Sequence, residues 1–197
     1  WIDGLQSTLT VFRLALDSEL VYLGDSGTTE AGPPSERTGV EMANFYRIRP
    51  WVSLELDLTL TDAEFTDVAE DERQIPGSVG RTLQLGLILG RPVGWFGTLR
   101  WRYFGDIPLT EDGAVQGQSS SLINGRLGYG FQTGLRLVVD GFNLLDREDP
   151  DIQYYYASRL PAEYSPTGEA EPIEGVEDVH LHPMEDRTVR VWLEYAF

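Results

Sequence analysis

The chain of 197 residues contains no cysteine and no lysine, so all 15 of its basic residues are arginine. Without cysteine it forms no disulfide and has neither a thiol nucleophile nor a thiolate metal site. Its net charge is −17, and the arginines are dispersed along the chain. A surface this acidic repels phosphate backbones, which argues against nucleic-acid binding.

Long apolar runs are missing as well. The best run, residues 83–89, is short and is interrupted by Gln84 and Gly86, whereas a membrane helix needs about 20 apolar residues. A helical membrane protein is therefore excluded. The other structure that can span lipid is a closed β-barrel, because lipid cannot satisfy free backbone groups. An apolar content of 41% is too high for a disordered acidic chain.

Apolar and polar residues alternate from Val52 to Thr61, with valine and four leucines on one side. A period of two predicts a strand and is incompatible with a helical stripe. The chain is therefore predicted to be all-β, with about eight strands. Further strands are expected at residues 10–16, 83–87, 99–103, 135–140 and 189–197, and weaker ones at residues 38–45 and 122–129.

The predicted connections alternate between short and long along the chain. Short turns are expected at residues 46–50, 90–94 and 130–134, and long acidic loops at residues 17–36, 66–81, 104–120 and 146–187. An outer-membrane barrel has this asymmetry, with short periplasmic turns and long extracellular loops. The fold class is therefore predicted to be an antiparallel transmembrane β-barrel segment. An aqueous barrel of the lipocalin type, the alternative, gives no reason for the loop asymmetry.

The two sides of each strand predict which surface meets lipid. Leu54, Leu56, Leu58 and Leu60 would face lipid, and the carboxylates between them would face a wet lumen. A wet lumen avoids the free-energy cost of burying charged carboxylates in a dry core. Lumen arginines could guide an anionic ligand or pair with these carboxylates. The predicted lumen-facing residues are Arg13, Glu55, Asp57, Arg100, Arg102, Arg126 and Arg136.

The last residues of the chain also fit a barrel. Outer-membrane barrels commonly finish with alternating apolar residues and a terminal aromatic, which the barrel-assembly machinery reads as a signal. Val191, Leu193, Tyr195 and Phe197 fit this form and are predicted to be the assembly signal. An aromatic girdle is expected at the periplasmic ends of the strands. Its predicted members are Trp51, Trp95, Tyr129, Tyr195 and Phe197.

Several segments resemble TonB-dependent receptors. Residues 139–147 resemble the "NLFD" signature of the penultimate strand, with Leu145 in place of the usual phenylalanine. The order and spacing of the other similar segments cover almost the whole chain. These are residues 35–41 (S-x-R-x-G-V-E), residues 75–77 (IPG), residues 101–105, and residues 151–160 followed by His182-Pro183.

This resemblance implies a barrel of about 22 strands closed by a plug domain. Residues 1–197 would be the C-terminal portion of that barrel, without the plug. The implied function is energy-coupled uptake of a scarce nutrient, such as a ferric siderophore, across the outer membrane of a Gram-negative bacterium. The implied partners are a small-molecule ligand, the TonB energy transducer acting through the plug, and outer-membrane lipid and lipopolysaccharide. The alternative is a complete small barrel of eight strands with a structural or adhesive role.

The long loop at residues 146–187 carries aromatic and cationic side chains that could contact a ligand; the alternative is a solvated acidic loop. The expected ligand-facing residues are Tyr154, Tyr155, Tyr156, Arg159, His180 and His182.

His180 and His182 are expected to point to opposite sides of an extended segment. They are therefore interpreted as part of a packing motif with Pro183 rather than as a metal site. No nucleophile motif or phosphate-binding loop is evident. We expect that the chain is not an enzyme and holds no cofactor.

Overall fold

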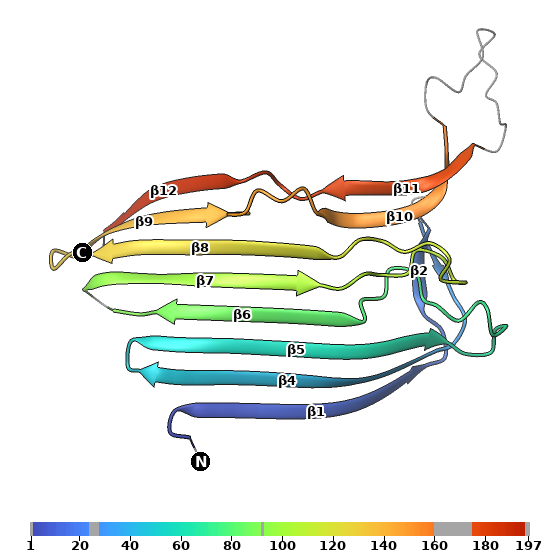
Figure 1. The fold of residues 1–197 in the computed structure, drawn as a ribbon, viewed down its shortest axis with the longest axis horizontal. Coiled ribbons are helices and arrows are strands. Elements are labelled where there is room, and N and C mark those ends of the chain that lie inside the picture. Colours follow the sequence, from blue (N-terminus) through green and yellow to red (C-terminus); the bar gives the residue numbers. More distant parts are fainter. Residues whose placement is uncertain (1, 24–27, 92, 160–174, 196–197) are drawn as a thin grey trace, which may run out of the picture.

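The computed structural model describes residues 2–23, 28–91, 93–159 and 175–195. Its main feature is one sheet of eight strands in the order β1-β4-β5-β6-β7-β8-β9-β12, with every neighbouring pair antiparallel (Figure 1). The predicted all-β class and its eight strands are confirmed. The strands are β1 (Leu5–Leu16), β4 (Ser35–Arg49), β5 (Val52–Phe65), β6 (Arg81–Leu89), β7 (Gly94–Phe104), β8 (Ser120–Gly130), β9 (Leu135–Phe142) and β12 (Thr188–Tyr195).

Two hairpins form separate two-stranded sheets within regions that were expected to be loops. One pairs β2 (Leu20–Leu23) with β3 (Thr28–Ala31), and the other pairs β10 (Pro150–Ser158) with β11 (Val176–Pro183). Both hairpins and the two remaining long loops lie at one end of the sheet, and the three tight turns lie at the other (Figure 1). The predicted loop asymmetry is therefore confirmed.

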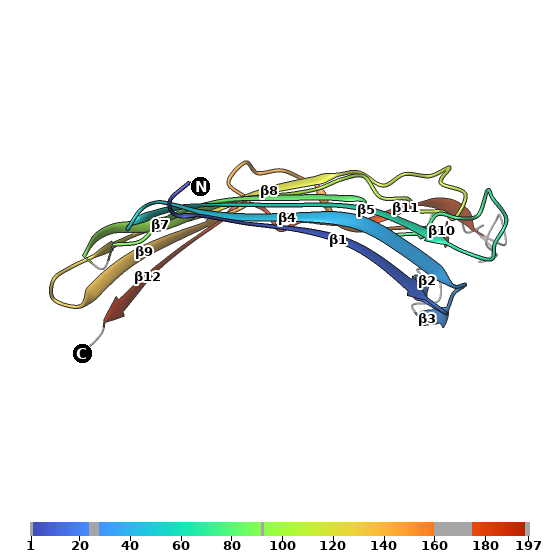
Figure 2. The ribbon, with the colours of Figure 1, turned by 90° about the horizontal axis from the view of Figure 1, so that it is seen from below.

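The sheet is open and curved (Figure 2). β1 pairs only with β4, and β12 pairs only with β9, among the residues that the structure describes. A complete eight-stranded barrel would need β1 to pair with β12. That alternative does not match the arrangement found. None of the described residues belongs to a helix that could span a membrane.

The strand register gives the two faces of the sheet different chemistry. On one face, Val11, Val40 and Leu60 are direct partners across β1, β4 and β5. We call it the apolar face; on it Val11 is 75% exposed, as expected of a surface that meets lipid. On the other face, the polar face, Glu55 and Arg100 both pair with Gly86. Side chains alternate between these faces along every strand.

Apolar side chains are buried at the loop end as well as within the sheet, where Val138 of β9 is 1% exposed. Phe65 is fully buried, and Ile75 and Leu109 are almost so. Residues 66–80 pack against residues 105–119, since the Gly77 amide donates to the Pro108 carbonyl (2.8 Å). The long loops therefore form an ordered layer above the strands.

Candidate functional site

The polar face collects most of the charged residues singled out from the sequence. Register and alternation place Glu55, Asp57, Arg100, Arg102, Arg126 and Arg136 together on it. The acidic members lie on β5, and the arginines lie on β7, β8 and β9. The face therefore has an acidic side and a basic side.

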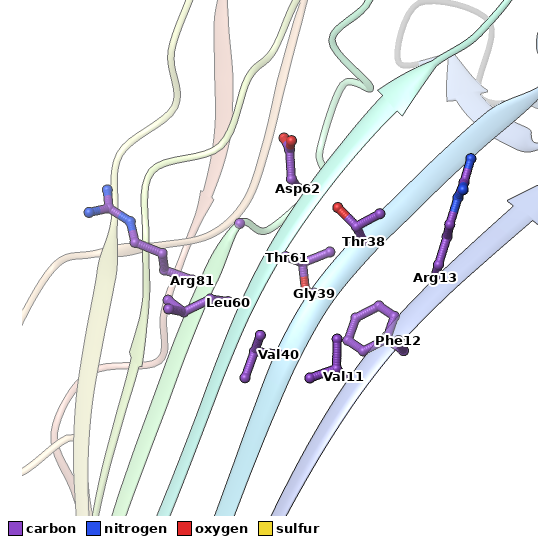
Figure 3. A pocket seen from close by; sticks show the side chains of 11 residues that line it. Val11, Phe12, Arg13, Thr38, Gly39, Val40, Leu60, Thr61, Asp62 and Arg81 are labelled. Carbon is purple, nitrogen blue, oxygen red and sulfur yellow. The ribbon is translucent and has the colours of Figure 1, made fainter.

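Arg13 departs from the expected set. It pairs with Thr38 and lies two residues after Val11 in β1, so it shares the apolar face with Val11, beyond the last aliphatic row (Figure 3). Its guanidinium forms an ion pair with Glu36 at 2.6 Å. The expectation that Arg13 shares a face with Glu55 is wrong because strand periodicity, not charge, decides the face. β1 carries apolar residues on both sides near this point, which conceals the alternation in the sequence.

A glycine permits an ion pair across three strands of the polar face. Gly86 lies between Glu55 and Arg100, and the Glu55 Oε2 atom is 3.7 Å from the Arg100 guanidinium. A Cβ atom at position 86 would lie 2.9 Å from Glu55 Oε2. The missing side chain therefore leaves room for the Glu55 carboxylate to lie over β6.

Asp140 connects β8, β9 and β12 on the same face. Its carboxylate accepts two hydrogen bonds from Arg126 (2.5 and 2.9 Å) and one from the Trp192 indole N–H (2.9 Å). Asp140 is only 5% exposed, so these donors supply the partners that a buried carboxylate requires. These hydrogen bonds hold the Arg126 guanidinium in place on the basic side of the polar face.

Two adjoining hollows lead from this cluster to the β10–β11 hairpin. The first, of about 450 Å³, is lined by Arg100, Arg126 and Asp140, and the second, of about 280 Å³, by Arg102 and His182. Both hollows are also lined by Asn124 and Phe142. The polar face is therefore continuous with the base of the hairpin.

The hairpin holds the predicted ligand-facing residues. Tyr154 pairs with His180, and Tyr156 stacks on the His180 ring, with centroids 3.9 Å apart. His180 and His182 lie two residues apart in β11 and share a face with Tyr154 and Tyr156. The expectation that the histidines point to opposite sides is wrong, since residues i and i+2 of a strand lie on the same face. No group of three metal-ligating residues occurs in the described part of the chain.

The other predicted residues of this loop lie elsewhere. Tyr155 is on the opposite face of the hairpin, where its hydroxyl donates to Glu177 (3.2 Å). Partial desolvation, and then this carboxylate, raise the pKa of Tyr155. Arg159 is exposed directly after β10. The structure therefore brings four of the six predicted residues onto one surface.

Asn143, in the segment that resembles the receptor signature, holds the hairpin to the sheet. Its backbone has a positive φ of 47°, which asparagine tolerates better than most residues. Its side-chain amide donates to the carbonyls of Arg147 (2.8 Å) and Glu185 (3.0 Å) and accepts from the Arg147 amide (3.0 Å). The connections that precede β10 and follow β11 are thereby joined at one buried residue. The sequence shows the segment but not this role.

Asp149 and Gln153 add contacts that sequence reasoning missed. Asp149 Oδ2 accepts hydrogen bonds from Arg147 Nε (2.8 Å) and from the Ser121 amide (2.7 Å). The bond from Arg147, with that from Ser121, lowers the pKa of the Asp149 carboxyl. Gln153 exchanges two hydrogen bonds with the Gln118 backbone (2.8 and 2.9 Å). No local sequence signal marks the bonds to Ser121 and Gln118, because these two residues are distant in the chain.

The segment that opens β4 has a comparable role at the other side of the sheet. Ser35 donates to Glu19 Oε2 (2.6 Å), and Arg37 forms an ion pair with the same carboxylate. The long connection between β1 and β4 is therefore fastened to the start of β4.

The predicted assembly signal lies along β12. Val191, Leu193 and Tyr195 share the apolar face and are all exposed, whereas Phe197 lies outside the described residues. Of the predicted girdle, Trp95 packs edge-to-face on Tyr129, with centroids 5.2 Å apart. Trp51 lies under the Arg91 guanidinium at 4.1 Å. All three aromatics are at the tight-turn end of the sheet.

Comparison with known protein families gives no match, and comparison with curated protein sequences gives none. Solved structures do match. The ferric yersiniabactin uptake receptor FyuA from Yersinia pestis has a TM-score of 0.69 at 16% identity, over 100% of this chain and 28% of its own. The ferric-catecholate import receptor Fiu from E. coli K12 has a TM-score of 0.64 at 18% identity, over 96% of this chain and 25% of its own.

The copper transporter OprC matches with a TM-score of 0.63 at 15% identity, over 99% of this chain and 29% of its own. These neighbours are TonB-dependent receptors. This chain spans between 25% and 29% of the length of each. It therefore has the fold of part of a TonB-dependent receptor barrel, as the sequence segments predicted.

Proposed function

We propose that residues 1–197 are the C-terminal portion of the barrel of a TonB-dependent receptor in the outer membrane of a Gram-negative bacterium. The observation that carries the proposal is the division of the sheet into an exposed apolar face and an arginine–carboxylate polar face. In this arrangement the apolar face meets lipid and the polar face lines the lumen. The open edges at β1 and β12 support it, because unpaired strand edges in lipid need further strands.

The whole receptor would take up a scarce nutrient in an energy-coupled manner, with a ferric siderophore as the favoured class of substrate. The neighbours' names include ferric yersiniabactin, ferric catecholate and copper, so the general activity is shared while the cargo varies. The TonB transducer would act through a plug domain supplied by the rest of the receptor. The neighbours are transport receptors, which is consistent with a chain that is not an enzyme.

The ligand would contact the hairpin before it reaches the lumen. Tyr154, Tyr156 and His180 present aromatic surface for stacking. The adjoining hollow is lined by His182 and Arg102 and also by Asp151 and Glu185. The Arg102 guanidinium offers a contact for a negatively charged group of a ferric siderophore. In this proposal the aromatic surface of the hairpin binds the ligand first, and the arginines of the polar face then guide it along the lumen.

The proposal is tested by uptake of iron-55 from a panel of ferric catecholate, ferric citrate and ferric yersiniabactin in cells that carry the whole receptor. We expect uptake of one member that a protonophore abolishes, and a several-fold loss of uptake in Arg102→Ala. Arg187→Ala, which removes an exposed arginine paired with Asp146 outside the hollow, is the matched control. Uptake that persists without an energised inner membrane would contradict the proposal, and no uptake of any member would overturn a ferric siderophore as the class of substrate.

A further inference from the structure

The two histidines of the chain, His180 and His182, both lie in β11, at the loop end of the molecule (Figure 1). Register and alternation place them on one face of the hairpin, whereas the sequence predicted opposite sides and therefore no metal site. Residues two apart in a strand are separated by roughly 7 Å. Two nitrogens that bind one metal ion are separated by roughly 4 Å or less. A tilt of the two rings toward each other therefore brings both to a single ion.

The surroundings of His180 hold its ring in the orientation and tautomer of a metal ligand. Its Nε2 atom lies 3.2 Å from the Tyr156 carbonyl oxygen. Because a carbonyl oxygen can only accept, Nε2 carries the proton, and Nδ1 of the neutral imidazole carries the lone pair that a metal ion binds. The Tyr156 ring also stacks on the imidazole, with centroids 3.9 Å apart and planes 19° apart. Histidines that bind metals characteristically donate their other ring N–H to a carbonyl or carboxylate in this way.

His182 is exposed, and the charge around it favours a cation. It lines the hollow of about 280 Å³ together with Asp151, Glu185 and Arg102. The two carboxylates outnumber the guanidinium, so the local potential attracts positive ions. Imidazole nitrogen suits copper, nickel and zinc, whereas magnesium and calcium prefer oxygen ligands. The ligand type and the charge therefore point to a divalent transition-metal ion.

We propose that His180 and His182 together bind one divalent transition-metal ion on this face of the hairpin. The ligands are Nδ1 of His180 and a ring nitrogen of His182. Copper binds most tightly of the divalent ions, because the affinity of a nitrogen site rises along this series to Cu²⁺. Two protein ligands leave the other coordination positions to water, so the ion exchanges readily instead of holding the fold together. The site goes beyond the proposed function, since it takes a bare ion and needs neither a plug nor energy coupling.

The test uses the whole receptor in detergent, purified without a histidine tag and washed with a chelator. It is titrated with Cu²⁺, and diethyl pyrocarbonate then modifies the histidines that carry no metal. Mass spectrometry of the peptides reads the modification at each histidine, so metal sites elsewhere in the receptor do not contribute. We expect Cu²⁺ to protect His180 and His182 with the same midpoint, and this measurement needs no variant. Protection of neither histidine, or of one alone, would overturn the site.

The variant His180→Phe gives the second readout, because it keeps an aromatic ring against Tyr156 but has no nitrogen ligand. We expect the Cu²⁺ concentration that half-protects His182 to rise about tenfold or more, since losing even an outer partner of a ligand costs about ten- to a hundredfold in affinity. The matched control is Tyr155→Phe, which lies on the opposite face of the hairpin and should leave the midpoint unchanged. An unchanged midpoint in His180→Phe would overturn the shared ion.

Exchanging Leu181 and His182 tests the geometry directly. The double variant Leu181→His, His182→Leu keeps two histidines but places them on opposite faces of β11. We expect its affinity for Cu²⁺ to match that of His180→Phe, and wild-type affinity would overturn the same-face site. A receptor that takes up its ferric ligand but shows no copper protection would overturn this inference alone. Copper protection without energy-dependent uptake would overturn the proposed function alone.

Discussion

Replacing Asn143 tests how the hairpin is fastened to the sheet. Asn143→Ala removes the amide group that joins the connections before β10 and after β11. It also places alanine at a residue whose φ is 47°. Asn143→Gly removes the same hydrogen bonds but tolerates the positive φ. The two variants therefore separate the contribution of the side chain from that of the backbone.

The expected magnitude follows from these contacts. Asn143 is 3% exposed, and its side chain makes three hydrogen bonds. Each bond contributes about 1 kcal/mol net, so glycine is expected to cost about 3 kcal/mol. The left-handed conformation adds about 1–2 kcal/mol for alanine. The local opening free energy should therefore fall by about 3 kcal/mol in Asn143→Gly and by about 4–5 kcal/mol in Asn143→Ala.

Native-state hydrogen exchange of the whole receptor measures this effect. The Arg147 amide donates directly to Asn143 Oδ1, and the Arg187 amide donates to Asp146 Oδ1 (3.1 Å) in the same network. We expect both amides to exchange roughly a hundredfold faster in the glycine variant and roughly a thousandfold or more faster in the alanine variant. The Val191 amide on β12 serves as the unchanged reference. Exchange at Arg187 that stays within about twofold of the wild type would refute the reasoning.

Three further predictions concern the sheet, the chain end and pH. Gly86→Leu should lower stability by about 1–3 kcal/mol, because its side chain displaces the Glu55 carboxylate; thermal unfolding measures this. Phe197→Asp should impair membrane assembly, measured as the heat-modifiable fraction on gels. The lowered pKa of Asp149 means that its contribution to stability is complete above about pH 4. As pH falls below that value through the folded-state pKa, exchange of the Ser121 amide should accelerate.

Each of these predictions has a control. Gly90→Leu should leave stability unchanged, since no atom lies within 4 Å of an added Cβ; equal losses at both glycines would contradict the crowding argument. Phe197→Tyr keeps a terminal aromatic and should assemble normally, whereas normal assembly of Phe197→Asp would count against the terminal signal. Asp149→Asn should remove the acid dependence at Ser121, and persistence of that dependence would assign it to another group.

The strands of the main sheet are predictable because alternation reports directly which side of a strand is apolar and which is polar. Leu54 to Leu60 and the intervening polar residues give β5 its faces without further information. Arg13 shows the limit of the method, since the mixed apolar residues near it conceal the phase of the alternation. Assigning it by charge placed it on the wrong face.

The hairpins and the Asn143 network could not be predicted from local patterns. Tyr154, Tyr155 and Tyr156 are consecutive aromatics, so β10 shows no alternation between apolar and polar residues. Asn143 bonds to Glu185, which is 42 residues away, and a single sequence carries no signal of that pairing. Resemblance to a receptor signature located the segment, but the reason for an asparagine there lies in its hydrogen bonds and its positive φ.

The central claim is that the apolar face meets lipid and the polar face lines a wet lumen. Residues 1–197 contain no cysteine. In a receptor with any cysteine outside these residues replaced by serine, single cysteines can be introduced at Leu54, Glu55, Leu56 and Asp57 and labelled with a water-soluble maleimide. The account predicts labelling at positions 55 and 57 and protection at positions 54 and 56. Equal labelling at all four positions, or the opposite pattern, would contradict it.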